Sequence, residues 1–156
     1  MTGIGFELVD LPTIFNENFF RVPDYQRGYS WQKKQVNDLL EDIGHLIKDK
    51  QSVTHFTGTL VLSRPDDSVV YHVVDGQQRL TTLSILISVV MEDVDKNERE
   101  RIKGLYFSRG DYGSEVQVLS LNSQSNDLYV EHIINGRPAR DKKLYLEADQ
   151  RIIEAR

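Results

Sequence analysis

The chain has 156 residues with 24 acidic and 19 basic side chains, so its formal net charge is −5. This balance argues against a self-sufficient nucleic-acid-binding domain, which usually presents a basic face. No cysteine occurs, which excludes disulfides, thiolate metal sites and cysteine nucleophiles and fits a cytoplasmic protein. The composition, 39% hydrophobic and 28% charged, is that of an ordinary globular domain, and we expect one domain over residues 1–156.

The first part of the chain predicts two helices separated by a strand. Apolar spacing predicts a short helix over residues 6–15, and residues 19–22 have the character of a strand that is closed by a proline. Ser30 is a suitable N-cap for the second helix, whose apolar stripe extends to residue 47.

The middle of the chain predicts a hairpin followed by a core helix. Residues 55–63 and 69–74 predict two strands joined by the turn-rich segment 64–68. The second strand is continuously apolar, which suggests burial on both faces and a place in the centre of a sheet. The apolar run at 80–91 is interrupted by hydroxyl side chains. It is too short to cross a bilayer core of about 30 Å, so we expect no membrane partner.

The last third predicts further short elements. A run of charge opens an exposed helix over about 95–107, residues 116–121 predict a strand, and residues 126–134 predict a helix. The final segment, 141–156, has helical character but ends without a cap or breaker. We therefore expect the chain to be the N-terminal part of a longer protein.

A polar cluster lies between the second hairpin strand and the core helix. It consists of Asp75, Gly76, Gln77, Gln78 and Arg79. Asp-Gly predicts a sharp turn, so the glutamines and the arginine should occupy the first helical turn. The first N–H groups of a helix lack intrahelical partners and carry the positive end of the dipole, so they favour a phosphate or another anion. Alternatively, Asp75 caps the helix, Gly76 makes the turn and the glutamines are solvated.

A second cluster precedes the helix that follows Ser30. Tyr25, Arg27, Tyr29 and Trp31, the only tryptophan, fall within seven residues. The aromatic side chains either cover the edge of the core or form a ligand wall, with faces for a planar ring and Arg27 for an anion.

Several common sites are not supported by the sequence. Neither a phosphate-binding loop of the G-x-x-x-x-G-K-[ST] type nor a G-x-G-x-x-G motif occurs, and nothing resembles a nucleophile elbow. The four histidines lack the spacing of a metal site; they are His45, His55, His72 and His132.

Three segments together resemble a known family. They are residues 22–31 (VPDYQRGYSW), 56–62 (FTGTLVL) and 74–83 (VDGQQRLTTL). In this order they resemble the GmrS-type N-terminal domain of modification-dependent (type IV) restriction and phage-defence proteins, with the core motifs spanning 19–94. The resemblance implies an α/β (α+β) fold of the ParB/sulfiredoxin-like type, a small mixed sheet flanked by helices, with extra C-terminal helices.

The resemblance also implies a function. It implies binding or hydrolysis of a nucleoside triphosphate that controls a DNA-cutting partner, usually a His-Asn-His-type nuclease domain or subunit. This sequence contains no such nuclease signature, so we do not expect the isolated chain to cut DNA. We expect an NTP-binding and NTP-hydrolysing regulatory domain of a DNA-targeting restriction or defence protein.

Each residue of the clusters receives a role in this hypothesis. Backbone N–H groups from Gly76 to Gln78 would hold the phosphates, and Arg79 would neutralise the charge that develops during phosphoryl transfer. Asp75 would position a Mg²⁺ ion or its bound water, or a nucleophilic water, while Gln77 or Gln78 orients that water. The second wall would bind the nucleotide through the loop side chains Tyr25, Gln26, Arg27, Tyr29 and Trp31.

The sequence leaves two alternative functions open. In the first, the same pocket or a groove beside Arg27 belongs to a non-catalytic module that senses DNA or a partner protein. In the second, the chain is a ParB-like nuclease, a reading that the lack of clustered acidic or histidine ligands disfavours.

Overall fold

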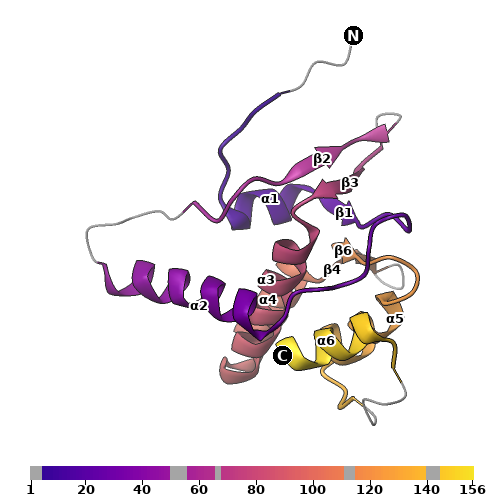
Figure 1. Cartoon of the computed structure of the whole chain (residues 1–156). Helices are drawn as coiled ribbons and strands as arrows, with labels where there is room; N and C mark the ends of the chain where they lie inside the picture. The colour runs from indigo at the N-terminus through magenta and orange to yellow at the C-terminus, as the bar shows by residue number, and fades with distance from the viewer. Residues whose placement is uncertain (1–4, 50–55, 66–67, 111–114, 140–144) are drawn as a thin grey trace.

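The computed structural model describes residues 5–49, 56–65, 68–110, 115–139 and 145–156 (Figure 1). Its main sheet has four strands in the order β2-β3-β1-β6. The strands are β1 (Phe19–Arg21), β2 (Val61–Ser63), β3 (Val70–Asp75) and β6 (Leu119–Ser120). β1 pairs in parallel with β3 and β6, whereas β2 is antiparallel to β3. The sheet is therefore mixed, and a separate antiparallel pair is formed by β4 (Ser108–Arg109) and β5 (Val116–Gln117).

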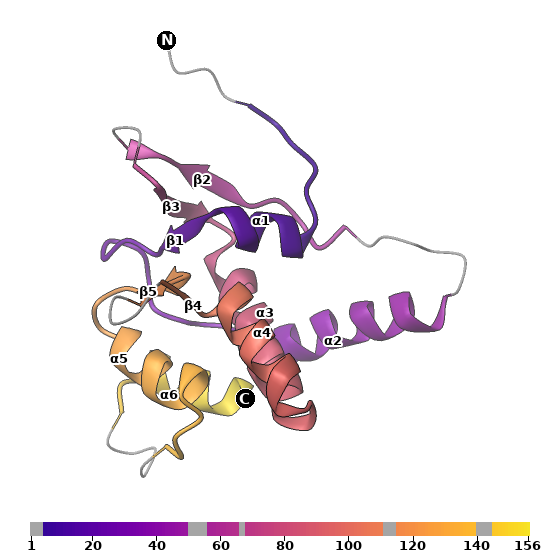
Figure 2. The same cartoon turned by 180° about the vertical axis from the view of Figure 1, so that it is seen from behind.

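Helices accompany the two sheets, and α2 extends to one side of the molecule, away from the main sheet (Figures 1 and 2). They are α1 (Leu11–Glu17), α2 (Lys33–Lys48), α3 (Gln77–Val90), α4 (Lys96–Tyr106), α5 (Asn126–Leu128) and α6 (Glu147–Ala155). A 3₁₀ turn, η2 (Met91–Asp93), continues α3, and a π-helical segment, η3 (Tyr129–Ile134), continues α5. The expected α/β (α+β) class, a mixed sheet with helices, is confirmed.

Helix α3 lies in the core and is buried over nine of its 14 residues. Three of its buried hydroxyls avoid the cost of desolvation because they donate to carbonyls of the preceding turn: Thr82 to Gln78 at 2.8 Å, Ser84 to Thr81 at 2.8 Å and Ser88 to Ile85 at 2.7 Å. A polar-looking helix can therefore occupy the centre of the molecule.

Two buried tyrosines attach other parts of the chain to α3. The Tyr129 hydroxyl, from η3, donates to Ser84 Oγ at 2.9 Å, and the Tyr29 hydroxyl shares a hydrogen bond of 2.8 Å with Thr82 Oγ1. Burial raises the pKa of both phenols, so each remains a neutral hydroxyl.

The predicted helix at 6–15 and the predicted N-cap at Ser30 are corrected by the structure. α1 starts only at Leu11, because Asp10 caps it by accepting from Thr13 N at 2.8 Å. α2 starts after Gln32, whose N–H is bound by the Gln35 side chain at 3.0 Å. Ser30 is not the cap because it precedes the cap residue Gln32, and its backbone N–H and carbonyl bind side chains of other segments.

The expected burial of the second hairpin strand is also wrong. β3 does lie inside the sheet, paired on both edges, but only Val73 is buried, whereas Val74 is 41% exposed and Asp75 is exposed. One face of the sheet is therefore open at the end of β3.

Other predicted elements differ in extent. The strand expected at 116–121 is divided at Val118 between two sheets, and the strand expected at 55–63 is reduced to β2, with residue 55 outside the described residues. The terminal helix expected at 141–156 is α6, and residues 141–144 lie outside the described residues.

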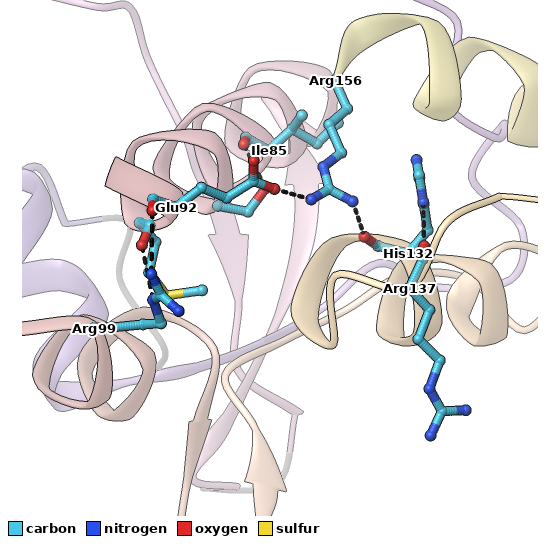
Figure 3. A network of polar contacts seen from close by, with 8 residues as sticks. Ile85, Glu92, Arg99, His132, Arg137 and Arg156 are labelled. Atoms are coloured by element: carbon cyan, nitrogen blue, oxygen red, sulfur yellow. Dashed lines mark hydrogen bonds and ion pairs between the residues drawn. The ribbon is translucent and has the colours of Figure 1, made fainter. Parts of the chain in front are cut away.

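A polar network joins the C-terminal helix to the end of α3 (Figure 3). The Arg156 guanidinium donates to the carbonyl of His132 and forms an ion pair with Glu92. On the other side of Glu92, Arg99 donates to backbone carbonyls, including that of Met91 at 3.0 Å. The network therefore connects α6, η3 and the start of α4 at η2, the turn that contains Glu92. Among the described helices, none is long and apolar enough to cross a membrane.

Arg109 closes the other end of the molecule by capping α1. Its guanidinium donates to the Phe15 carbonyl at 2.8 Å and to the carbonyls of Asn16 and Asn18, and it lies 4.4 Å from the centroid of the Phe19 ring. Because the last carbonyls of a helix lack intrahelical donors, this one side chain replaces several missing hydrogen bonds.

We expect Arg109→Ala to lower the free energy of unfolding by about 2–3 kcal/mol, since three carbonyls lose a charged donor. Arg109→Lys should recover only part of this loss, because an ammonium cannot reproduce the planar fork. Urea denaturation followed by circular dichroism measures both values. Arg101→Ala is the control, because its exposed pair with Glu98 should contribute little to the free energy of unfolding. Full recovery by lysine would contradict the capping role.

Candidate functional site

The junction between β3 and α3 has an uncapped helix N-terminus. Gly76 is the N-cap residue with φ +89° and ψ +5°, and no side chain of the described residues caps the helix. Asp75 therefore does not cap α3 as expected, because it is the last residue of β3 and its exposed side chain leaves the capping position to a glycine. A Cβ at residue 76 would lie 2.9 Å from Leu60 Cδ1 and 3.1 Å from the Thr59 carbonyl oxygen, so both the backbone angle and the space require glycine.

Gln77 and Gln78 are buried, at 8% exposure each, and hold the loop that follows β1. Gln77 Nε2 donates to the Arg27 carbonyl at 3.0 Å. Gln78 Nε2 donates to the Gly28 carbonyl at 3.2 Å, and its Oε1 accepts from Ser30 N at 2.7 Å. The alternative in which the glutamines are solvated is therefore wrong.

The same loop is held from a third position, the turn before α5. Asn122 Nδ2 donates to the Gln26 carbonyl at 3.3 Å, and Ser123 N donates to Asp24 Oδ1 at 2.7 Å. Three consecutive loop carbonyls, those of Gln26, Arg27 and Gly28, thus accept from three side-chain amides. In return, Gln26 Nε2 donates to the Val74 carbonyl at 2.9 Å.

The aromatic cluster of the loop is divided between the surface and the core. Tyr25 is 76% exposed and Arg27 is exposed, so both are open to solvent beside the junction. Tyr29 is 5% exposed and hydrogen-bonded to Thr82, and Trp31 packs partly buried against the core. Tyr29 and Trp31 therefore cover the core, and the open part of the predicted wall is Tyr25 and Arg27.

The segment before β2 completes the junction on its other side. Arg79 Nη1 donates to the Thr59 carbonyl at 3.2 Å. Gly58 has φ +109°, and a Cβ there would lie within 2.6–2.8 Å of the Arg79 guanidinium atoms, so only glycine leaves room for this side chain. The three sequence segments singled out above therefore meet at the start of α3.

The parallel pairing of β1 and β3 explains why they meet. The two strands run in the same direction, so their carboxyl ends open at the same edge of the sheet, where ligands bind in open α/β sheets. The loop continues from β1 and the Asp75–Arg79 cluster continues from β3. The groups at this edge include the exposed Asp75 carboxylate, the guanidinium groups of Arg27 and Arg79 and the N–H groups of the first turn of α3.

A metal ion would have one carboxylate here. No group of three or more His, Asp or Glu side chains that could hold a metal occurs in the described residues. A single exposed Asp75 suits Mg²⁺, because this ion keeps several waters and takes its other ligands from phosphates.

The sequence prediction missed several residues that shape this site. Asn122 lies 96 positions from its partner Gln26, and no local pattern connects them. Asp24 and Gly58 stand inside motif segments, but their roles depend on contacts with Ser123 and Arg79 that only the fold reveals.

We expect Gln78→Met to loosen the loop, because Ser30 N–H and the Gly28 carbonyl lose their partners while the side-chain volume is kept. The free energy of unfolding should fall by about 2–3 kcal/mol, and hydrogen exchange at the Ser30 amide should accelerate. Gln35→Met is the control, since it removes an exposed capping amide of α2 and should leave Ser30 protected. Unchanged exchange at Ser30 in the Gln78 variant would contradict the contact.

The Asp24–Ser123 contact should depend on pH. The hydrogen bond from the Ser123 N–H lowers the pKa of the Asp24 carboxyl, so its stabilisation is present above the ordinary carboxyl range and is lost as pH falls through the folded value. We expect the difference in melting temperature between wild type and Asp24→Asn to be constant at about pH 5–7 and to shrink below about pH 4. A difference that stays constant down to about pH 3 would contradict this assignment.

The sequence matches one protein-family model, described as the GmrSD restriction endonuclease N-terminal domain, over residues 11–155. Comparison with curated proteins gives no match. The matched range begins at the first residue of α1 and includes the loop, the segment before β2 and the junction at the start of α3. The chain therefore belongs to the family of GmrSD restriction endonuclease N-terminal domains.

Proposed function

We propose that the chain is an NTP-binding and NTP-hydrolysing regulatory domain of a DNA-targeting restriction system. The observation that carries the proposal is the uncapped N-terminus of α3, which has Arg79 on one side and the exposed Arg27 on the other. An anion is the natural partner of such a group of donors, because the N–H groups and the dipole of a helix N-terminus add to the arginine charges.

The phosphates would bind to the backbone N–H groups from Gly76 to Gln78. The absence of a Cβ at residue 76 lets a phosphate approach the backbone closely. Arg27 would supply the second cation, since the hydrogen bond between its carbonyl and Gln77 Nε2 keeps the loop beside the first turn.

Arg79 would neutralise the charge that develops on the transferring phosphoryl group. Among the described residues its Nη1 donates to the Thr59 carbonyl at 3.2 Å, and a guanidinium carries five N–H donors in a planar fork. The carbonyl contact orients the side chain, which leaves the other donors for phosphate oxygens.

Asp75 would hold Mg²⁺ or orient the attacking water. The ion, if held there, would supply positive charge that offsets the charge of the phosphates. In this proposal Gln77 and Gln78 are positioning residues. Their amides bind the loop backbone and would thereby set the distance of Arg27 from the phosphates.

The base or ribose would contact Tyr25. This side chain is 76% exposed and adjoins Arg27 through Gln26, so its ring is available for stacking. The small cavity beside Gln77 and Gln78 measures about 20 Å³ and is too small for a nucleotide, so the nucleotide would bind to the outer surface of the junction.

Hydrolysis would regulate another part of the restriction system. The family description names a restriction endonuclease, and this sequence has no His-Asn-His nuclease signature. We therefore propose that nucleotide turnover here controls DNA cutting by a nuclease domain or subunit that the chain contacts.

We expect Arg79→Ala to lower the rate of phosphate release from NTPs by about 100-fold or more, because one charged donor to the transition state is lost. Gly58→Ala should lower it in the same direction, since the new Cβ displaces the Arg79 guanidinium. Phosphate release with ATP, GTP, CTP and UTP plus Mg²⁺ is the measurement. Titration calorimetry with a non-hydrolysable NTP separates binding from turnover.

Arg101→Ala is the matched control, because it removes an exposed arginine on α4 outside the junction. Normal turnover by a stably folded Arg79→Ala protein would refute the assignment. A salt-dependent shift of labelled DNA by wild type, without NTP binding, would favour the non-catalytic sensor instead.

A further inference from the structure

A small cavity lies beneath the loop that carries Arg27. It measures about 20 Å³ and is bounded by the loop, the first turn of α3 and the turn that precedes α5. Space of about 10–15 Å³ is enough for one water molecule, so a single water-sized occupant fits.

Three buried polar atoms of the residues around this cavity have no hydrogen-bond partner within the described part of the chain. They are Gln77 Oε1, Asn122 Oδ1 and Ser125 Oγ. The three residues are 8%, 6% and 1% exposed, respectively. Buried polar atoms are nearly always paired, and three unpaired atoms around one cavity indicate a shared partner.

The hydrogen bond that each side-chain amide makes to the loop shows which of its two polar atoms is left without a partner. Gln77 Nε2 donates to the Arg27 carbonyl and Asn122 Nδ2 donates to the Gln26 carbonyl. A carbonyl accepts only from a donor, so the amide nitrogens must face the loop and the oxygens remain free. The site thus offers two acceptors and one hydroxyl, which can donate.

We propose that this cavity binds one ordered water molecule. The water would donate to Gln77 Oε1 and Asn122 Oδ1 and would accept from the Ser125 hydroxyl. This uses both of its protons, and three hydrogen bonds are typical of a buried water.

A metal ion fits these residues less well. Among the described residues no carboxylate lines the cavity, whereas Arg27 does, so its charge opposes a cation. Divalent cations also require more oxygen ligands than the three free atoms supply.

The water would couple two segments that both hold the loop. Gln77 and Asn122 each bind one loop carbonyl, and the water would join their other ends to Ser125 at the N-terminus of α5. The inference rests on these contacts and not on nucleotide binding, so it is tested on the nucleotide-free chain.

Ser125→Ala tests the proposal, because the hydroxyl that it removes has no partner among the described residues. If a water is bound, the variant should melt about 2–5 °C lower, and amide exchange over residues 26–30 should accelerate. An unchanged or higher melting temperature would overturn the proposal, since an empty site gains from losing an unpaired hydroxyl. Ser88→Ala is the control, as its buried hydroxyl bonds only within α3, and it should leave exchange over 26–30 unchanged.

A crystal structure of the chain provides the second measurement. We expect one density peak at about 2.7–3.2 Å from all three atoms, without anomalous signal after a rubidium chloride soak. An empty cavity, or an anomalous peak that marks a monovalent cation, would overturn the proposal.

Discussion

Hydrogen bonding of side-chain amides to peptide carbonyls is the interaction on which the site depends. The connection between β1 and α2 has no regular structure, so its backbone carbonyls need donors from elsewhere. Gln77, Gln78 and Asn122 supply them to consecutive residues of the loop. Because two of these donors stand on the first turn of α3, the loop is placed beside the uncapped helix N-terminus. The geometry that would hold a phosphate thus follows from the hydrogen bonds that the backbone carbonyls of the loop require.

Helix α3 can serve as this support because it is rigidly enclosed. Three of its hydroxyls, those of Thr82, Ser84 and Ser88, are paired within the helix, and two of these also receive tyrosine hydroxyls from the loop and from η3. Buried hydroxyl groups normally disfavour burial of a helix, but here they form hydrogen bonds that attach the helix to its neighbours. The network around Glu92 then fixes its far end to α6 and α4 (Figure 3).

Much of the fold could be predicted from local patterns, whereas the details of the site could not. The Asp-Gly turn between a β-branched strand and an apolar helix correctly indicated the junction, because its turn chemistry and periodicity are both local. The cap at Asp75 was wrong because a capping side chain and a left-handed glycine compete for the same position, and Gly76 occupies it. The cap predicted at Ser30 is wrong because α2 begins only after Gln32, and the backbone of Ser30 binds distant side chains instead. Asn122 could not be found, since only the pairing of β1 with β6 brings its turn to the loop.

The division of the loop into a bound backbone and open side chains has one more consequence. The side-chain amides of residues 77, 78 and 122, which lie in other segments, hold the loop backbone, whereas the side chains of Tyr25 and Arg27 are exposed. Substitutions at these two positions can therefore change the surface beside the start of α3 while the loop backbone keeps its hydrogen bonds.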